Sequence, residues 1–328
     1  MLKHKQWRIY AILFIFALAA RLLYLTCSYG LGRLSDHPDG AEYHAYAVNL
    51  AEHGTYTDGQ WTAFRAPGYP AFMSVVIRFW GDSYAKIQIA QTIVSSFIPL
   101  LVYGIGLSVG GPTVALISGV VACVHFGLVD EPAHMMSESV FTILYALVLL
   151  FTLKAAKSTK YSIACGVVLA LAWLTRPVGV LLLPFSCAWL LIKCGIRIGA
   201  KRIALVLSLT LIVMMPWWIR NYRLHHAFIP SALQTGFVLL SANVPPAALS
   251  SVMYVHDSMP ELQRDQALMK DGIAYFKAQP ISHLLKRAVT KMLIHFYPFL
   301  PVYDLFYMLL LPFCFVGIIV SLKKVTVD

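Results

Sequence analysis

The chain has 328 residues, of which 12% are charged and 59% are hydrophobic, and its mean hydropathy is +0.70. Soluble domains carry about 25% charged residues, so the composition excludes that class. High apolar content and the lack of a visible short repeat also exclude disordered, collagen-like and coiled-coil chains. The composition therefore predicts an all-α polytopic membrane protein.

The net charge of +11 arises from 26 Lys and Arg residues against 15 Asp and Glu residues. Basic residues beside membrane helices report orientation, and here they do not alternate with exposed aromatic residues as in a nucleic-acid site. We expect no nucleic-acid partner. The six cysteines lie mostly in apolar runs and form no CxxC pair, so no disulfide framework is expected.

Eight apolar runs predict a bundle of about eight transmembrane helices, although several are shorter than the ~20 residues of a full span. The runs are 9–27, 87–109, 112–128, 139–153, 162–174, 178–192, 203–219 and 305–322. Lys and Arg residues flank the runs on the side that includes both termini, which predicts cytoplasmic termini. Arg21, inside the first run, is expected to extend outward to the interface.

Two long segments are expected outside the membrane. Residues 28–84 are rich in Asp, His, Tyr and Gly. The second segment, 220–300, contains a basic amphipathic stretch with Lys286, Arg287 and Lys291. Such a stretch is typical of a helix on the headgroup surface, where these residues contact anionic lipid; contact with a substrate is the alternative.

The stretch 161–192 is flanked by Lys160 and Lys193 and has Arg176 and Pro177 near its middle. As one helix it would be about 48 Å long at 1.5 Å per residue, too long for one crossing. Because both flanks are basic, we predict a hairpin with Arg176 at its outer tip. A charge at the depth of the lipid phosphates is costly unless paired, so Arg176 is a candidate functional residue.

Asp39, Tyr43 and Tyr46 have the spacing of one helix face, with a carboxylate at its start. After Pro38, Asp39 also suits a helix N-cap, so a capping role and a chemical role both remain open. Asp39 also belongs to the first of five short motifs that occur in order along the chain.

The motifs are Asp39-x-x-Glu42-Tyr43-His44-x-Tyr46-Ala47-x-x-Leu50, Arg65-x-Pro67-Gly68-Tyr69-Pro70, Ser137-Glu138-x-x-Phe141, Leu174-Thr175-Arg176-Pro177 and Pro216-Trp217-Trp218-Ile219-Arg220-Asn221-Tyr222. Together they resemble the GT-C membrane glycosyltransferases, in particular the branch related to protein O-mannosyltransferases and lipid A aminoarabinose transferases. The resemblance covers residues 9 to about 243, roughly three quarters of the chain. The chain departs from this family at one position. The protein O-mannosyltransferases have two adjacent acidic residues in this loop, whereas in this chain Asp39 is followed by Gly40.

The resemblance implies inverting transfer of a sugar from a polyprenyl-phosphate-linked donor to a hydroxyl or amine at the outer face. Asp39 matches the family's loop aspartate and is assigned as the base that deprotonates the acceptor. Arg65 matches the basic residue before the Pro-rich turn, and Arg176 has the depth to meet the same donor phosphate. Tyr43, in the first motif, is assigned to substrate binding.

Other candidates each have a structural alternative. Glu138 is either a second site carboxylate or a helix-start residue favoured by the dipole. Arg220 and Asn221 either hold donor or acceptor, or anchor a helix end at the interface. Asp130 and Glu131 could hold a divalent cation, Mg²⁺ or Mn²⁺, together with Glu138, because some GT-C enzymes need one; a solvated turn is the alternative.

We divide the chain into a GT-C-like transmembrane catalytic module (1–219, with outer loop 28–84), an extracytoplasmic segment with an interfacial helix (220–300), and a last helix with a cytoplasmic tail (301–328). The expected location is the inner membrane, and the expected acceptor is an envelope lipid, glycan or protein, such as lipopolysaccharide. The alternatives are a transporter or flippase of lipid-linked sugars and a non-catalytic subunit of an envelope assembly. A transporter would have polar residues at mid-membrane, whereas these helix centres are apolar.

Overall fold

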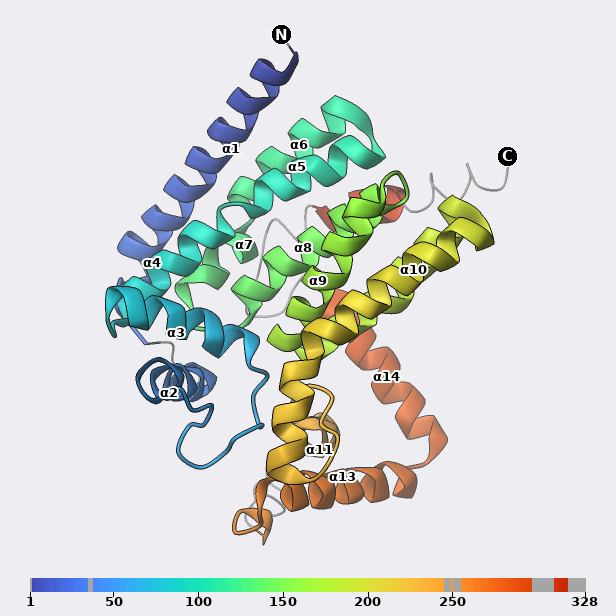
Figure 1. Cartoon of the computed structure of the whole chain (residues 1–328). Coiled ribbons are helices and arrows are strands. Elements are labelled where there is room, and N and C mark those ends of the chain that lie inside the picture. The colour runs from blue at the N-terminus through green and yellow to red at the C-terminus, as the bar shows by residue number, and fades with distance from the viewer. Residues whose placement is uncertain (1, 35–37, 245–248, 250–254, 297–309, 318–328) are drawn as a thin grey trace.

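The computed structural model describes residues 2–34, 38–244, 249, 255–296 and 310–317, and every regular element in these ranges is a helix (Figure 1). In chain order the helices are α1 (Leu2–Tyr24), η1 (Leu25–Tyr29), α2 (Pro38–His53), α3 (Gly68–Trp80), α4 (Tyr84–Ser95), α5 (Ile98–Val109), α6 (Gly111–Val124), α7 (Phe126–Asp130), η2 (Glu131–Ala133), α8 (Glu138–Ala155), α9 (Thr159–Thr175), η3 (Pro177–Leu181), α10 (Leu182–His225), α11 (Thr235–Ser241), α13 (Glu261–Ala278) and α14 (Ile281–Phe296). The all-α class predicted from composition is confirmed.

Several helices are long and apolar enough to cross a membrane. Among the described residues they are Gln6–Tyr29, Tyr84–Val109, Glu138–Ala155 and Pro177–His225, with a fifth if α6 and Phe126–Ala133, bent by 57°, form one span. This count is lower than the predicted eight. The runs 178–192 and 203–219 fall in one long helical stretch, 162–174 lies in the shorter α9, and only residues 310–317 of the last run are described.

The long stretch Pro177–His225 is interrupted at Gly195, which has φ 71° and ψ 170°. A straight helix of 49 residues would be about 74 Å long, more than twice the bilayer core. A Cβ on Gly199 would lie 2.9 Å from the Leu190 carbonyl oxygen, nine residues earlier in the chain. The chain therefore folds back at Gly195, and the two arms correspond to the two separate runs predicted there.

The predicted hairpin around Arg176 is confirmed. Helix α9 ends at Thr175, Arg176 has extended backbone angles (φ −143°, ψ 134°), and η3 turns the chain into α10, which packs against α9. Gly179 permits the turn, because its Cβ position would be 2.7 Å from the backbone of Ala172.

The two predicted outer segments meet at one end of the molecule, where α2, α11 and α13 lie in Figure 1. The Glu261 carboxylate, in the first turn of α13, accepts hydrogen bonds from the backbone N–H groups of Thr62 (2.9 Å) and Ala63 (2.8 Å) and from the Thr62 hydroxyl (3.0 Å). The Leu233 N–H donates to the Ala63 carbonyl at 2.7 Å. Residues far apart in sequence thereby hold the loop before α3 in place.

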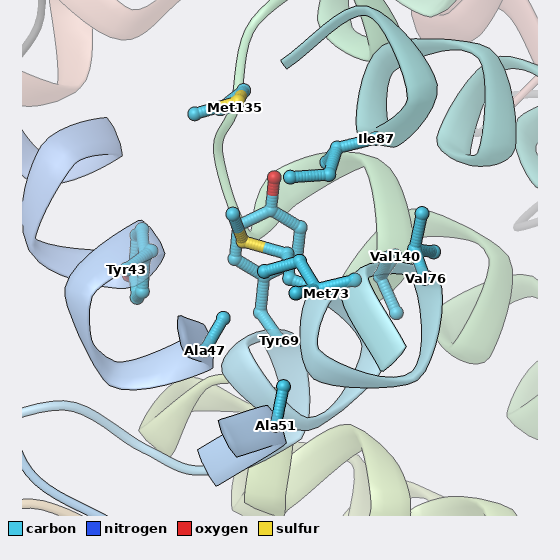
Figure 2. Close-up of a cluster of buried hydrophobic side chains, with 10 residues drawn as sticks. Tyr43, Ala47, Ala51, Tyr69, Met73, Val76, Ile87, Met135 and Val140 are labelled. Atoms are coloured by element: carbon cyan, nitrogen blue, oxygen red, sulfur yellow. The ribbon is translucent and has the colours of Figure 1, made fainter. Parts of the chain in front are cut away.

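Helix α2 is fixed by a buried cluster shared with α3, α4 and α8 (Figure 2). Tyr43 and Ala47 of α2 face Tyr69 and Met73 of α3. The Tyr69 ring is fully buried, and its hydroxyl donates to Gln91 at 2.9 Å. This cluster decides which face of α2 is exposed to the cavity described below.

The structure changes the expectation for Arg21 and adds protein contacts to two basic residues of α14. Arg21 is 1% exposed and donates to the Ala17 and Cys123 carbonyls, so the outward orientation is wrong. Helix α6 ends just after Cys123, and its C-terminal carbonyls are free to accept from a buried guanidinium. In α14, Arg287 and Lys291 donate to the Asn243 and Ala242 carbonyls, just beyond the end of α11. The interfacial position of α14 stays a prediction.

Candidate active site

A cavity of about 580 Å³ opens where α2, α8, the α9–η3 turn, α11 and α13 converge. Six charged side chains line it: Asp39, Glu42, Arg65, Glu138, Arg176 and Arg264. Five of the predicted site residues, Asp39, Tyr43, Arg65, Glu138 and Arg176, are brought together here.

Arg65 lies between two carboxylates of α2. Its Nη2 and Nη1 donate to Asp39 Oδ1 (2.7 Å) and Oδ2 (3.2 Å), and its Nε and Nη2 donate to Glu42 Oε2 (2.8 and 2.5 Å). The Tyr43 ring lies 5.1 Å from the guanidinium carbon. Burial alone would lower the pKa of Arg65, but Tyr43, Glu42 and Asp39 outweigh it and raise the pKa above its usual value. Arg65 is therefore a permanent cation.

Local geometry explains why both carboxylates reach Arg65. Asp39 and Glu42 are three residues apart in the first turns of α2, so they share one face of the helix. Arg65 precedes Pro67 and Gly68, where α3 begins. Because Gly68 has no side chain, α3 approaches α9 so closely that a Cβ would lie 2.5 Å from Thr175 Oγ1. This close contact places Arg65 beside the Arg176 turn.

The second ion pair of the cavity joins Arg176 Nη1 to Glu138 Oε1, at the start of α8. Ser137 connects the two halves of the site: its Oγ accepts from Tyr43 Oη and from Arg176 Nη1, each at 3.3 Å. Both members of the Arg176–Glu138 pair are about one-third exposed, whereas Arg65 is nearly buried. Arg65 and Arg176 are thus each already paired with a carboxylate of the cavity, and the third cation, Arg264, donates to Asp257 at 3.1 Å.

Arg220 and Asn221 lie outside the residues that line the cavity. Arg220 donates to the carbonyls of Thr62 (2.8 Å) and Tyr56 (2.7 Å) and to the Asn221 side chain (2.7 Å). Its guanidinium also lies over the Tyr56 and Trp217 rings. These contacts join the end of α10 to the loop, so Arg220 positions the loop that carries Arg65.

Asp130 and Glu131 also lie apart from the cavity. Asp130 accepts from Tyr24 Oη (2.5 Å) and contacts His134 Nε2 (3.1 Å), while Glu131 accepts from the Thr142 hydroxyl (3.2 Å). Within the described ranges, no group of three or more His, Cys, Asp or Glu residues is arranged to hold a metal ion. A requirement for Mg²⁺ or Mn²⁺ stays a prediction without a defined cluster.

Glu42, Ser137 and Arg264 line the cavity with polar groups, and none of the three has a role predicted from the sequence. The role of Glu42 could have been predicted from the sequence, because Glu42 is about one helical turn after Asp39. It supplies the second carboxylate of the cavity, whereas Gly40, directly after Asp39, has no side chain. Ser137 precedes Glu138 in its motif. No sequence pattern predicts a role for Arg264, because it lies on α13, far along the chain from the other site residues. In the folded chain its guanidinium carbon lies 5.2 Å from the Trp61 ring centre, and Arg264 lines the cavity.

Residues 65–219 match the model of a protein family described as dolichyl-phosphate-mannose-protein mannosyltransferase. This stretch is slightly less than half of the chain; it begins at Arg65 and contains Glu138 and Arg176, while Asp39 and Glu42 precede it. The match supports the GT-C superfamily, and with it a membrane glycosyltransferase that uses a polyprenyl-phosphate sugar. No curated protein and no solved structure matches the chain significantly.

Proposed function

We propose that the chain is an inverting glycosyltransferase that moves a sugar from a polyprenyl-phosphate donor to an envelope lipid, glycan or protein at the outer face of the inner membrane. The observation that carries the proposal is the convergence of Asp39, Arg65 and Arg176 on one cavity. The family match over residues 65–219 supports the donor class.

In this mechanism, the acceptor oxygen or nitrogen attacks the anomeric carbon from the side opposite the phosphate. Asp39 takes the acceptor proton, a new bond to the sugar forms, and the bond between the anomeric carbon and the phosphate oxygen breaks with its electrons left on the polyprenyl phosphate. The leaving phosphate needs no proton, but it needs cations where negative charge develops. Arg65 and Arg176 supply them.

In this structure the guanidinium groups of Arg65 and Arg176 are both paired with carboxylates. Some of these carboxylates must therefore move away before a donor phosphate can bind. The Glu42 and Glu138 side chains are 39% and 37% exposed, whereas that of Asp39 is 25% exposed. Release of Glu138 costs little, because its ion pair with Arg176 is about one-third exposed and such pairs contribute only ~0–1 kcal/mol. Release of Glu42 leaves the nearly buried Arg65 still paired with Asp39, so no unpaired buried charge results. The phosphate would then replace Glu42 and Glu138, while Arg65 keeps Asp39 oriented toward the acceptor.

The first test compares envelope glycans and glycolipids by mass spectrometry in a deletion strain complemented with wild type, Asp39→Asn or Glu52→Gln. Asp39→Asn keeps the side-chain shape and removes the base, so we expect transfer to fall about 10²- to 10⁴-fold. Glu52 is the matched control, because it is an exposed carboxylate on the same helix that does not line the cavity. The proposal is supported if a glycan or glycolipid lacks the mass of one sugar in the deletion and Asp39→Asn strains and keeps it in the wild-type and Glu52→Gln strains.

Transfer at the wild-type rate by Asp39→Asn would remove the base assignment. The purified chain must also transfer sugar by itself, and failure to do so would favour the non-catalytic subunit.

A further inference from the structure

A second and larger cavity, of about 810 Å³, lies between α1, α5, α8, α9 and α10. It is lined by Lys154, Lys157 and Lys193, by the Tyr161 and Trp189 rings, and by apolar residues of α5 and α8. The proposed reaction does not use any of these residues.

This cavity is at the opposite end of the helices from the candidate active site. Glu138 at the start of α8 lines the active-site cavity, and Lys154 near the end of the same helix lines the second one. Their separation along the helix axis is about 24 Å at 1.5 Å per residue, most of the ~30 Å thickness of the hydrocarbon core. The two cavities therefore face opposite membrane surfaces.

All charged groups that line the second cavity are cations. The lining contains three lysines and no carboxylate among the residues that the structure describes. The Lys154 ammonium lies 5.5 Å from the Tyr161 ring centre, and the Lys193 ammonium lies 5.1 Å from that of Trp189. These rings orient the ammonium groups but do not neutralise them. Like charges gathered in one cavity repel each other, and an anion between them would relieve the repulsion.

We propose that this cavity binds a phosphate-bearing anion through Lys154, Lys157 and Lys193. The phosphate belongs either to the headgroup of an anionic membrane lipid or to a soluble phosphate. The apolar wall of α5 and α8 fits lipid chains beside a headgroup, and the volume lies within the ~300–1,000 Å³ of ligand sites. The site is independent of the proposed sugar transfer.

The test measures binding to the full chain in neutral detergent, by native mass spectrometry and by the shift in thermal unfolding. The probes are dioctanoyl phosphatidylglycerol, dioctanoyl phosphatidylcholine and inorganic phosphate. We expect phosphatidylglycerol to bind more tightly than phosphatidylcholine, and Lys154→Gln and Lys193→Gln each to weaken it about fivefold. Lys154→Arg should retain binding, which separates a loss of charge from a loss of folding.

Lys201→Gln is the matched control, because Lys201 is an exposed lysine of α10 that does not line the cavity. Inorganic phosphate that binds as well as the lipid would support the site with a soluble anion as its ligand. The proposal is overturned if wild type binds neither anion, if phosphatidylcholine binds as tightly as phosphatidylglycerol, or if Lys201→Gln loses as much as Lys154→Gln.

Discussion

At the scale of single residues, we propose that the carboxylates of the candidate active-site cavity occupy the positions that the donor phosphate would take. Arg65 contacts Asp39 and Glu42, and Arg176 contacts Glu138, so each guanidinium keeps its orientation before a donor arrives. A planar guanidinium binds carboxylate and phosphate with similar geometry, and therefore the same donors can serve both.

Arg176→Ala should weaken use of the donor more than it slows the chemical step. Loss of a charge-assisted hydrogen bond to phosphate is expected to raise the donor KM about 10- to 100-fold. Steady-state kinetics with varied donor and fixed acceptor measures this. Arg223→Ala, an exposed arginine at the end of α10, is the control and should leave both constants unchanged. A change in acceptor preference alone would contradict the phosphate role of Arg176.

At the scale of elements, the contact between α3 and α9 sets the distance between the two arginines. Gly68→Ala would place a methyl group within 2.8 Å of the Thr175 backbone, where no flexible side chain can yield. We expect a loss of about 1–3 kcal/mol in unfolding free energy, with reduced transfer because the start of α3 moves away from α9. Thermal unfolding and a transfer assay of the same sample measure both effects. Gly54→Ala is the control for added volume, because nothing lies within 4 Å of its Cβ position, although its φ of 69° adds strain.

The contact between α13 and the loop before α3 has a similar role. Glu261→Ala leaves the Thr62 and Ala63 N–H groups without their acceptor, at about 1–3 kcal/mol for each buried group. Faster hydrogen exchange at these amides and a higher donor KM are expected. Glu261→Gln keeps one acceptor oxygen and should have an intermediate effect. Unchanged exchange in Glu261→Ala would show that other contacts hold the loop.

At the scale of the whole molecule, the two cavities predict opposite accessibility of the two ends. Glu52 is on α2 near the candidate active site, and Thr159 is at the α8–α9 turn near the lysine cavity. Each is replaced by Cys in a variant that lacks all native cysteines. A membrane-impermeant maleimide added to intact cells should label Glu52→Cys only, and lysed cells should show labelling of both. Labelling of Thr159→Cys alone would place the active site inside and contradict the proposed outer-face reaction.

The sequence alone determined the features that depend on neighbours along the chain. Runs of apolar residues identify membrane helices because each residue buries its own surface, and the length of 161–192 required a turn near Arg176. The placement of Asp39 and Glu42 on one face also follows from helix geometry alone.

Only the tertiary structure decided which of these residues meet. Arg65 is matched by two carboxylates, Arg264 joins the cavity from α13, and Arg220 holds the loop outside the cavity. Arg21 is buried because α1 packs against α6, and the lysine cavity exists because five helices converge around it. These outcomes depend on packing between segments distant in sequence, which local periodicity does not encode.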